Sequence, residues 1–263
     1  MAMKERTVKR TAQPLVVKNL NLSIGGTPIL KNINLELPAH KITCIVGPSG
    51  CGKSTLLKTL NRLTDMTDDV HIEGSVLLGD QDIIKASGVE LIELRRRIGL
   101  VPQQPTPLPM SIYDNVAYGR RIHKLSRAGR QMHKSVLRYL NAVGLVTEVK
   151  GKLHSSASRL SIGQQQRLCL ARSLAVEPEY ILADEATSAL DPISSRTVED
   201  LFVKLKEDYS IIMVTHTLSQ AQRIADYVVF IYMGEVVETG TADQVFNHPQ
   251  HELTQNYLKG IFS

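Results

Sequence analysis

Residues 47–54 could bind phosphate, because glycine, lysine and serine recur there at a fixed spacing. The stretch reads GPSGCGKS and fits G-x-x-x-x-G-K-[ST], the P-loop pattern. Glycines let the backbone curl so that N–H groups point at one anion, and the following helix adds its N-terminal positive charge. The residues expected to hold the phosphates are Gly47, Pro48, Ser49, Gly50, Cys51, Gly52, Lys53, Ser54 and Thr55. The alternative is a glycine-rich turn that fits the pattern by chance.

Two acidic residues could serve a metal ion and a water molecule bound near these phosphates. Asp184 and Glu185 follow the apolar stretch 180–183, which predicts a buried strand. Ligand groups collect at the carboxyl ends of such strands. Asp184 would then hold Mg²⁺ together with Ser54, and Glu185 would orient or deprotonate the attacking water. Solvated loop carboxylates are the alternative, and the P-loop favours the metal-site interpretation.

A histidine, His216, follows a second apolar strand expected over 210–215. A lone histidine is more often structural than catalytic. This one is expected at the same sheet edge as Asp184, which favours a contact with the γ-phosphate.

The elements that must position these residues are indicated by hydrophobic periodicity and by turn residues. Strands are expected at 14–37 (two, joined at Gly25-Gly26), 41–46, 70–84 (short, with a turn at Gly79-Asp80), 98–101, 180–183, 210–215 and 227–237. Helices are expected after the P-loop, at 90–97, over most of 111–175 with breaks at 126–129 and 151–158, after Asp191-Pro192, and as an exposed tail at the end. Ser161 and Gln164 form a capping box.

Length and composition are those of an ordinary globular protein. The chain has 263 residues, of which 43% are hydrophobic and 22% charged, and its apolar runs are too short to span a bilayer. The basic N-terminal segment, 1–10, lacks the apolar region of a signal peptide. Three scattered cysteines indicate reduced thiols. The net charge is +5, and the positive residues are scattered except at the N-terminus and in the arginine run 95–97. This pattern favours a mildly basic surface, and no nucleic-acid partner is expected.

Several motifs in order resemble those of the ATP-binding subunits of ABC transporters, over almost the whole chain. They are the P-loop, a Q-loop glutamine at Gln103, the signature-like LSIGQ at 160–164, the Walker B pair 184–185, the D-loop SALD at 188–191 and the switch histidine His216. Within that family, GPSGCGKSTLLKTLNR, ELRRRIGLVPQQPTPLPMSIYDNVAYG, GQQQRLCLARSLAVEPE and TSALDPISS look closest to the phosphate-import members.

The resemblance implies an α/β fold with a P-loop (RecA-like) ATPase core, an N-terminal antiparallel β subdomain and an inserted helical subdomain. A single ABC ATPase domain would span 1–263. Segments 14–103 and 177–263 would form the β subdomain and the core, and 104–176 the helical signature subdomain.

The resemblance also implies ATP hydrolysis with Mg²⁺ at the cytoplasmic face of a membrane. Ser161, Gly163 and Gln164 of one copy would contact the ATP of another in a head-to-tail homodimer. Gln103 would bind Mg²⁺ and couple the site to the helical subdomain. Membrane-spanning permease subunits and a solute-binding protein would complete a phosphate importer. The alternatives are import of another solute, a soluble ABC-type clamp, or a metabolic phosphotransferase.

Three positions depart from the family pattern. Ile24 stands where an adenine-stacking aromatic residue is expected, Ile162 replaces the first signature glycine, and Ala186 replaces a proline. An aliphatic base contact with weaker selection for adenine, and slow but real turnover, are therefore expected.

Overall fold

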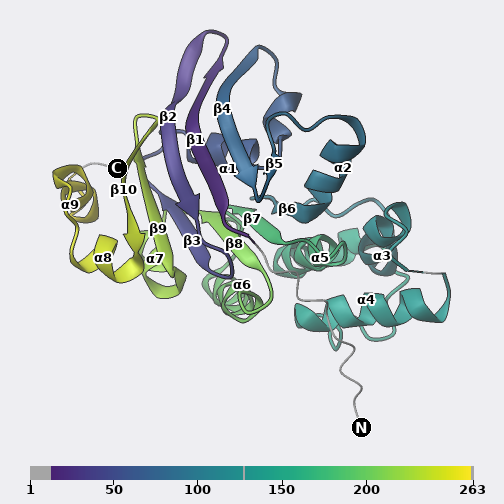
Figure 1. Cartoon of the computed structure of the whole chain (residues 1–263). Coiled ribbons are helices and arrows are strands. Elements are labelled where there is room, and N and C mark those ends of the chain that lie inside the picture. The colour runs from purple at the N-terminus through teal and green to yellow at the C-terminus, as the bar shows by residue number, and fades with distance from the viewer. Residues whose placement is uncertain (1–12, 127, 262–263) are drawn as a thin grey trace.

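A six-stranded, mostly parallel sheet carries the candidate site residues (Figure 1). The computed structural model describes residues 13–126 and 128–261; the basic N-terminal segment 1–10 lies outside them. The strands follow the order β10-β9-β3-β8-β7-β6, and only β10 is antiparallel to its neighbour. Their bounds are β3 Ile42–Val46, β6 Ile98–Val101, β7 Tyr180–Asp184, β8 Ser210–Val214, β9 Tyr227–Tyr232 and β10 Glu235–Thr241. Every residue of β3, β7 and β8 is buried, as their continuous apolar runs predict.

A second, antiparallel sheet is formed mainly by the N-terminal third of the chain. Its order is β2-β1-β4-β5, with β1 Leu15–Ile24, β2 Thr27–Leu37, β4 Val70–Leu78 and β5 Gln81–Asp82. The turn between β1 and β2 is Gly25-Gly26, and both glycines have positive φ, 53° and 77°. A two-residue turn of this kind needs that backbone region, so the predicted hairpin is confirmed.

Two hydrophobic cores cover the two faces of the six-stranded sheet. In β3, Ile45 points into a core shared with the antiparallel sheet, α1 (Lys53–Thr59) and α2 (Gly88–Arg97). Its neighbours Cys44 and Val46 point into the opposite core, which the remaining α-helices cover. Those are α3 Ile112–Ile122, α4 Arg130–Ala142, α5 Ile162–Leu174, α6 Pro192–Leu205, α7 Leu218–Ile224, α8 Ala242–Asn247 and α9 Glu252–Leu258. Short 3₁₀ helices lie at Leu63–Met66 and Ala157–Arg159.

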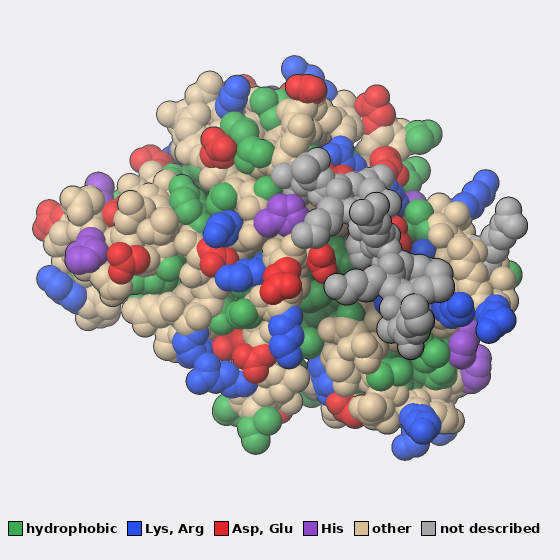
Figure 2. All heavy atoms as spheres, turned by 60° about the horizontal axis from the view of Figure 1, so that its bottom comes forward, with side chains coloured by type: hydrophobic (Ala, Val, Ile, Leu, Met, Phe, Trp, Pro, Cys, Tyr) green, Lys and Arg blue, Asp and Glu red, His purple; other side chains and the backbone are tan. Residues whose placement is uncertain are grey.

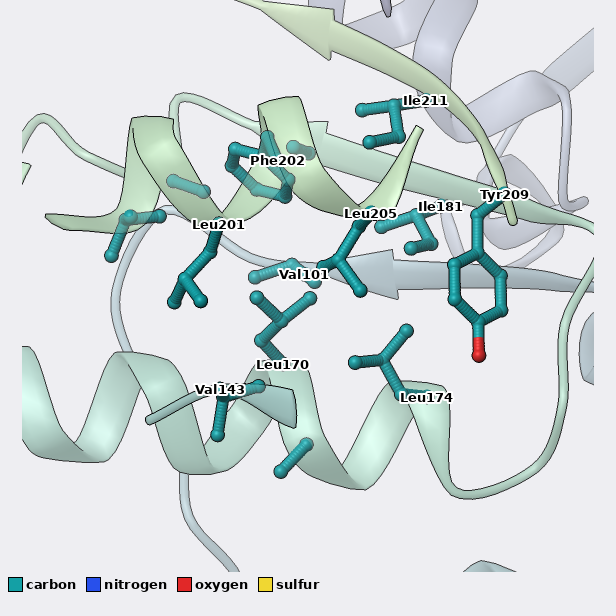
Figure 3. Close-up of a cluster of buried hydrophobic side chains, with 14 of the residues drawn as sticks. Val101, Val143, Leu170, Leu174, Ile181, Leu201, Phe202, Leu205, Tyr209 and Ile211 are labelled. Atoms are coloured by element: carbon teal, nitrogen blue, oxygen red, sulfur yellow. The ribbon is translucent and has the colours of Figure 1, made fainter. Parts of the chain in front are cut away.

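Helix α5 joins the helical part of the chain to the sheet. It contacts β6 on one side and both α3 and α4 on the other (Figure 1). In the close-up of Figure 3, Leu170 and Leu174 of α5 face Leu201 and Leu205 of α6. The same cluster includes Val101, Ile181 and Ile211 from β6, β7 and β8. This packing fixes α5 against the strands that carry the candidate site.

The helical stretch is confirmed as three helices, but its second break is longer than the expected 151–158. Helix α4 ends at Ala142, where Gly144 with a positive φ of 69° follows, and turns with one short 3₁₀ helix fill the chain up to α5 at Ile162. The predicted capping box is present: the Ser161 hydroxyl accepts from the Gln164 backbone, and the Gln164 side chain accepts from the Ser161 backbone. None of the helices in the described part of the chain has both the length and the hydrophobicity needed to span a bilayer.

The C-terminal helices are not an exposed tail, so that prediction is wrong. Val245 of α8 and Tyr257 of α9 are 1% and 6% exposed. The Tyr257 ring stacks on Phe230 of β9, with the ring centroids 4.9 Å apart. Each short helix buries a few side chains against β9 and β10, and such a sparse apolar face gives little periodic signal.

Charges of both signs are mixed on the surface. Figure 2 shows Lys and Arg side chains interspersed with Asp and Glu on the face that lies at the bottom of Figure 1. The arginine run is largely used within the chain: Arg96 pairs with Glu93, Arg97 pairs with Glu179 at 2.8 Å, and Arg95 donates to backbone carbonyls. The run therefore holds α2 in place.

Candidate functional site

Four segments far apart in the sequence meet at the carboxyl edge of the parallel strands. The P-loop follows β3, Gln103 follows β6, Asp184 ends β7, and His216 follows β8. Since β3, β8, β7 and β6 are consecutive neighbours running the same way, their carboxyl ends lie at one edge.

The P-loop backbone has a shape that only glycine permits at key positions. Gly47, Gly50 and Gly52 have φ of 149°, 77° and 99°. A Cβ on Gly47 would collide with the backbone carbonyl oxygen of Ile231. Lys53 begins α1 and is 6% exposed; its ammonium donates to the carbonyls of Gly47 (2.8 Å) and Pro48 (2.6 Å). The Lys53 ammonium therefore lies inside the loop that would bind the phosphates.

Cys51 lies inside this loop with its Sγ 3.8 Å from the Lys53 ammonium. Burial raises the pKa of the thiol, and the nearby lysine only partly opposes that effect. The thiol is therefore neutral at neutral pH. All three cysteines are free and buried, which agrees with the expected reduced thiols.

The next residue, Ser54, contacts the Walker B aspartate. Its hydroxyl donates to Oδ1 of Asp184 at 2.7 Å, and Lys58 lies 3.5 Å from Oδ2 of the same carboxylate. Sequence reasoning missed Lys58. The available signal was its spacing: Ser54 and Lys58 are four residues apart and share one face of α1.

The Glu185 carboxylate contacts two other site residues, Gln103 and His216. Its Oε2 accepts from the Gln103 amide at 3.0 Å and lies 3.3 Å from Nδ1 of His216. Gln103 also donates to the Ser188 hydroxyl at 3.2 Å, a contact that sequence reasoning missed. Glu185 has a φ of 47°, a left-handed backbone that costs free energy for a residue with a side chain and that is frequent at active sites.

The signature residues form a separate group at the start of α5. The hydrogen bonds of Ser161 and Gln164 connect these two residues to each other, and Gln164 also donates to Glu148 at 2.8 Å. Gly163 packs against α6, where an added Cβ would lie 2.9 Å from the Ser194 hydroxyl. Ile162 is the first helical residue and is 55% exposed. Its backbone is helical, so a β-branched side chain is not strained there.

A cleft of about 420 Å³ opens beside Glu185 and His216. Its walls come from the loop after β7, from the loop after β8, and from α6 and α7. The polar side chains lining it include Ser188, Ser195, Arg196, Thr217, Gln220 and Arg223.

Comparison with known proteins gives the chain a family. The sequence profile of the family described as ABC transporter matches residues 30–188, more than half of the chain. This chain belongs to the ABC transporter family. The expected α/β fold of a P-loop ABC ATPase is therefore confirmed.

Relatives and solved structures agree with that family. The chain is 52% identical, over 246 residues, to the phosphate import ATP-binding protein PstB 3 from each of two strains of Streptococcus pneumoniae. That alignment covers 94% of this chain and 98% of each relative. The structure of cbiO1 from Clostridium perfringens, part of the ABC transporter complex cbiONQ, is 27% identical with a TM-score of 0.77, covering 92% of this chain and 94% of that one. A bacterial Atm1-family ABC exporter with ATP bound shares the fold at 24% identity and a TM-score of 0.78, covering 96% of this chain and 42% of that one.

Proposed function

We propose that this chain is the ATP-hydrolysing subunit of an ABC importer that takes up inorganic phosphate. The observation that carries the ATPase assignment is the meeting of Ser54 with Asp184, and of Glu185 with His216, at one sheet edge. The solute rests on the similarity to the phosphate import proteins of Streptococcus pneumoniae.

The P-loop would hold the triphosphate of ATP. Its N–H groups and the N-terminus of α1 favour an anion. The Lys53 ammonium, now on the carbonyls of Gly47 and Pro48, would exchange these bonds for phosphate oxygens. This exchange keeps the buried cation paired before and after ATP binds.

Magnesium fits the donor set beside the loop. The Ser54 hydroxyl and the Asp184 carboxylate are hard oxygen ligands already in contact, and Gln103 would contribute its amide oxygen. When bound, Mg²⁺ neutralises charge on the β- and γ-phosphate oxygens. Lys58, now 3.5 Å from Asp184, is a second cation beside this carboxylate.

Glu185 would orient the attacking water and accept its proton as the oxygen bonds to the γ-phosphorus and the bond to ADP breaks. His216 lies 3.3 Å from the same carboxylate, and its imidazole would contact the γ-phosphate. Gln103 bonds to the same carboxylate, and it connects the site to the helical segment that follows it.

A second copy would complete the site in a head-to-tail homodimer. Ser161, Gly163 and Gln164 lie on the helical side of the chain, and the N-terminus of α5 would face the γ-phosphate of the other copy. ATP would then favour the closed dimer and hydrolysis would release it. In this proposal, segment 104–176 moves as the signature subdomain against the core formed by 14–103 and 177–263.

The same proposal places the chain peripherally at the cytoplasmic face of the membrane. Its partners there are permease subunits and a solute-binding protein, and no nucleic acid takes part. Opening and closing of the dimer would drive alternating access in the permease.

The ATPase assignment is tested with the purified chain and its Glu185→Gln variant. We expect the variant to lose roughly 100-fold or more in turnover, because the base is removed. It should still bind ATP and accumulate as a dimer. Glu207→Gln, at an exposed carboxylate in the turn after α6, is the matched control and should hydrolyse normally. Equal turnover of wild type and Glu185→Gln would refute the assignment.

The solute is tested separately, in cells that lack their own phosphate-import ATPase. Expression of this chain should restore uptake of radiolabelled phosphate, and Glu185→Gln should not. Restored uptake of sulfate instead of phosphate would assign a different importer. A chain that stays away from membranes and co-sediments with ribosomes would favour the soluble clamp.

A further inference from the structure

A buried polar network lies next to the loops that carry Glu185 and His216. It consists of Thr187 in the loop after β7, Glu199 on α6 and Gln220 on α7, which are 7%, 2% and 5% exposed. Thr187 begins the stretch TSALDPISS, but the sequence analysis gave none of these three residues a role. They come from three elements and meet at the inner wall of the 420 Å³ cleft.

Gln220 is the centre of this network. Its side-chain amide donates to the Thr187 hydroxyl at 2.7 Å and to Oε1 of Glu199 at 3.1 Å. An amide nitrogen has two hydrogens, and each has an acceptor here. The orientation of the Gln220 side chain is therefore fixed from both sides.

Glu199 is anchored in turn by a charge. Arg223, also on α7, donates to both carboxylate oxygens of Glu199 at 2.8 to 3.1 Å. A buried carboxylate needs such a partner, and a bidentate pair has a defined geometry. The network thus ties α6 and α7 together before it reaches the loop after β7.

The network joins the two loops whose side chains meet at the site. Thr187 is two residues after Glu185, and Gln220 is four residues after His216, in the first turn of α7. The strained backbone at Glu185, with φ of 47°, persists only when its surroundings hold it. The hydrogen bond between Thr187 and Gln220 is one buried contact that can hold the Glu185 backbone close to the loop that carries His216.

We propose that Thr187 and Gln220 are positioning residues for ATP hydrolysis, whose hydrogen bond sets Glu185 against His216. This inference rests on the proposed ATPase function. It predicts a loss in kcat with little change in KM, because the phosphates are expected to bind mainly to residues 47–55, whereas the network residues belong to the loop after β7, to α6 and to α7. A misplacement of catalytic groups by about 1 Å can lower a rate by about 100-fold.

The test compares Thr187→Val, which removes only the hydroxyl, with Thr187→Ser, which keeps it. We expect Thr187→Val to lower kcat by roughly 10- to 100-fold with KM for ATP within about twofold of wild type. Thr187→Ser should recover most of the activity. The matched control is Thr43→Val: Thr43 in β3 is fully buried, and its hydroxyl has no partner among the described residues. It should hydrolyse ATP at the wild-type rate.

A second variant, Gln220→Met, keeps the side-chain length and removes both donors. The double variant Thr187→Val/Gln220→Met should have a kcat close to that of the slower single variant, since both changes break the same Thr187–Gln220 bond and only Gln220→Met also breaks the bond to Glu199. Melting temperatures are measured for all variants, and Glu185→Gln/Thr187→Val should still form an ATP-dependent dimer.

Three results would overturn the inference while leaving the ATPase assignment intact: wild-type kcat in Thr187→Val, no recovery in Thr187→Ser, or fully additive losses in the double variant. An inactive wild-type chain would instead refute the proposed function itself.

Discussion

At Ile162, the effect of the isoleucine on the backbone can be distinguished from its effect on the surface of the chain. It begins α5 with a helical backbone, so the missing glycine is not needed there for its conformation. Its side chain is 55% exposed beside Ser161, on the surface that would meet the ATP of another copy. Any cost of this isoleucine therefore falls on dimer closure and not on folding.

We predict that Ile162→Gly raises ATP turnover severalfold by removing this bulk from the interface. The measurement is kcat of the purified variant. Ile122→Gly, at an equally exposed isoleucine that ends α3, is the control and should not gain activity. An unchanged kcat in Ile162→Gly would show that the isoleucine is harmless.

Ile24 is the second informative residue. It ends β1 next to Gly25, pairs across the hairpin with Thr27 and is half-buried against the core of the antiparallel sheet. An aromatic ring in its place would add stacking worth about 0.5–1.5 kcal/mol. We predict that Ile24→Tyr binds ATP about 2- to 10-fold more tightly and prefers ATP over GTP more strongly. Titration with both nucleotides tests this, with Ile24→Leu as control; full base selectivity already in wild type would contradict it.

Among the helices, α9 packs against β9 and β10 of the six-stranded sheet. The Tyr257 ring stacks on Phe230 of β9, with the ring centroids 4.9 Å apart. We predict that Tyr257→Ala lowers the free energy of unfolding by about 3–5 kcal/mol, as for other buried aromatic side chains. Tyr257→Phe keeps the ring and should lose less than about 1.5 kcal/mol. Urea unfolding measures both, and equal stability of Tyr257→Ala and wild type would mean that α9 is dispensable.

The helical segment is joined to the loop after α5 by a partly buried ion pair. Arg120 of α3 donates to Glu177 Oε1 at 3.0 Å, and so does the Tyr139 hydroxyl of α4. Burial by itself raises the pKa of Glu177, but these hydrogen bonds and the charge of Arg120 outweigh it, so the pKa lies below its usual range. A carboxyl whose pKa is lowered on folding adds stability above its unfolded pKa and loses it as the pH falls.

We therefore predict that wild type is more stable than Glu177→Gln at pH 7, and that the difference shrinks as the pH falls below about 4.3, the ordinary glutamate pKa. Urea unfolding at several pH values measures the difference. The exposed-site variant Glu207→Gln should show a much smaller pH-dependent difference. A gap for Glu177→Gln that stays constant down to pH 3 would exclude this ion pair as its source.

For the whole molecule, the central prediction is a composite site shared by two copies. Ser161 and the P-loop lie in separate parts of one chain, so only another copy would bring them together around ATP. In the Glu185→Gln background, we predict that Ser161→Arg abolishes the ATP-dependent dimer while ATP still binds. Ser87→Arg, at the exposed N-cap of α2, is the control and should dimerise. Size-exclusion chromatography with ATP decides; a dimer that survives Ser161→Arg would reject the composite site.

The sequence by itself determined those features that depend on neighbouring residues. The P-loop, the capping box at Ser161, the hairpin at Gly25-Gly26 and the buried strands are local patterns of residue type and spacing. The apolar runs before Asp184 and His216 also predicted the strand ends that carry them. Most main elements of the fold could be predicted in this way, but helix α7 (Leu218–Ile224) and the burial of the C-terminal helices could not.

Only the tertiary structure decided which of these pieces touch. Strand order in the sheet differs from chain order, and it alone places Gln103 and His216 on the same carboxylate of Glu185. The bond between Thr187 and Gln220 likewise depends on how α7 packs beside the loop after β7. Such contacts join residues remote in sequence, and no local propensity encodes them, because packing of the whole core fixes their distance.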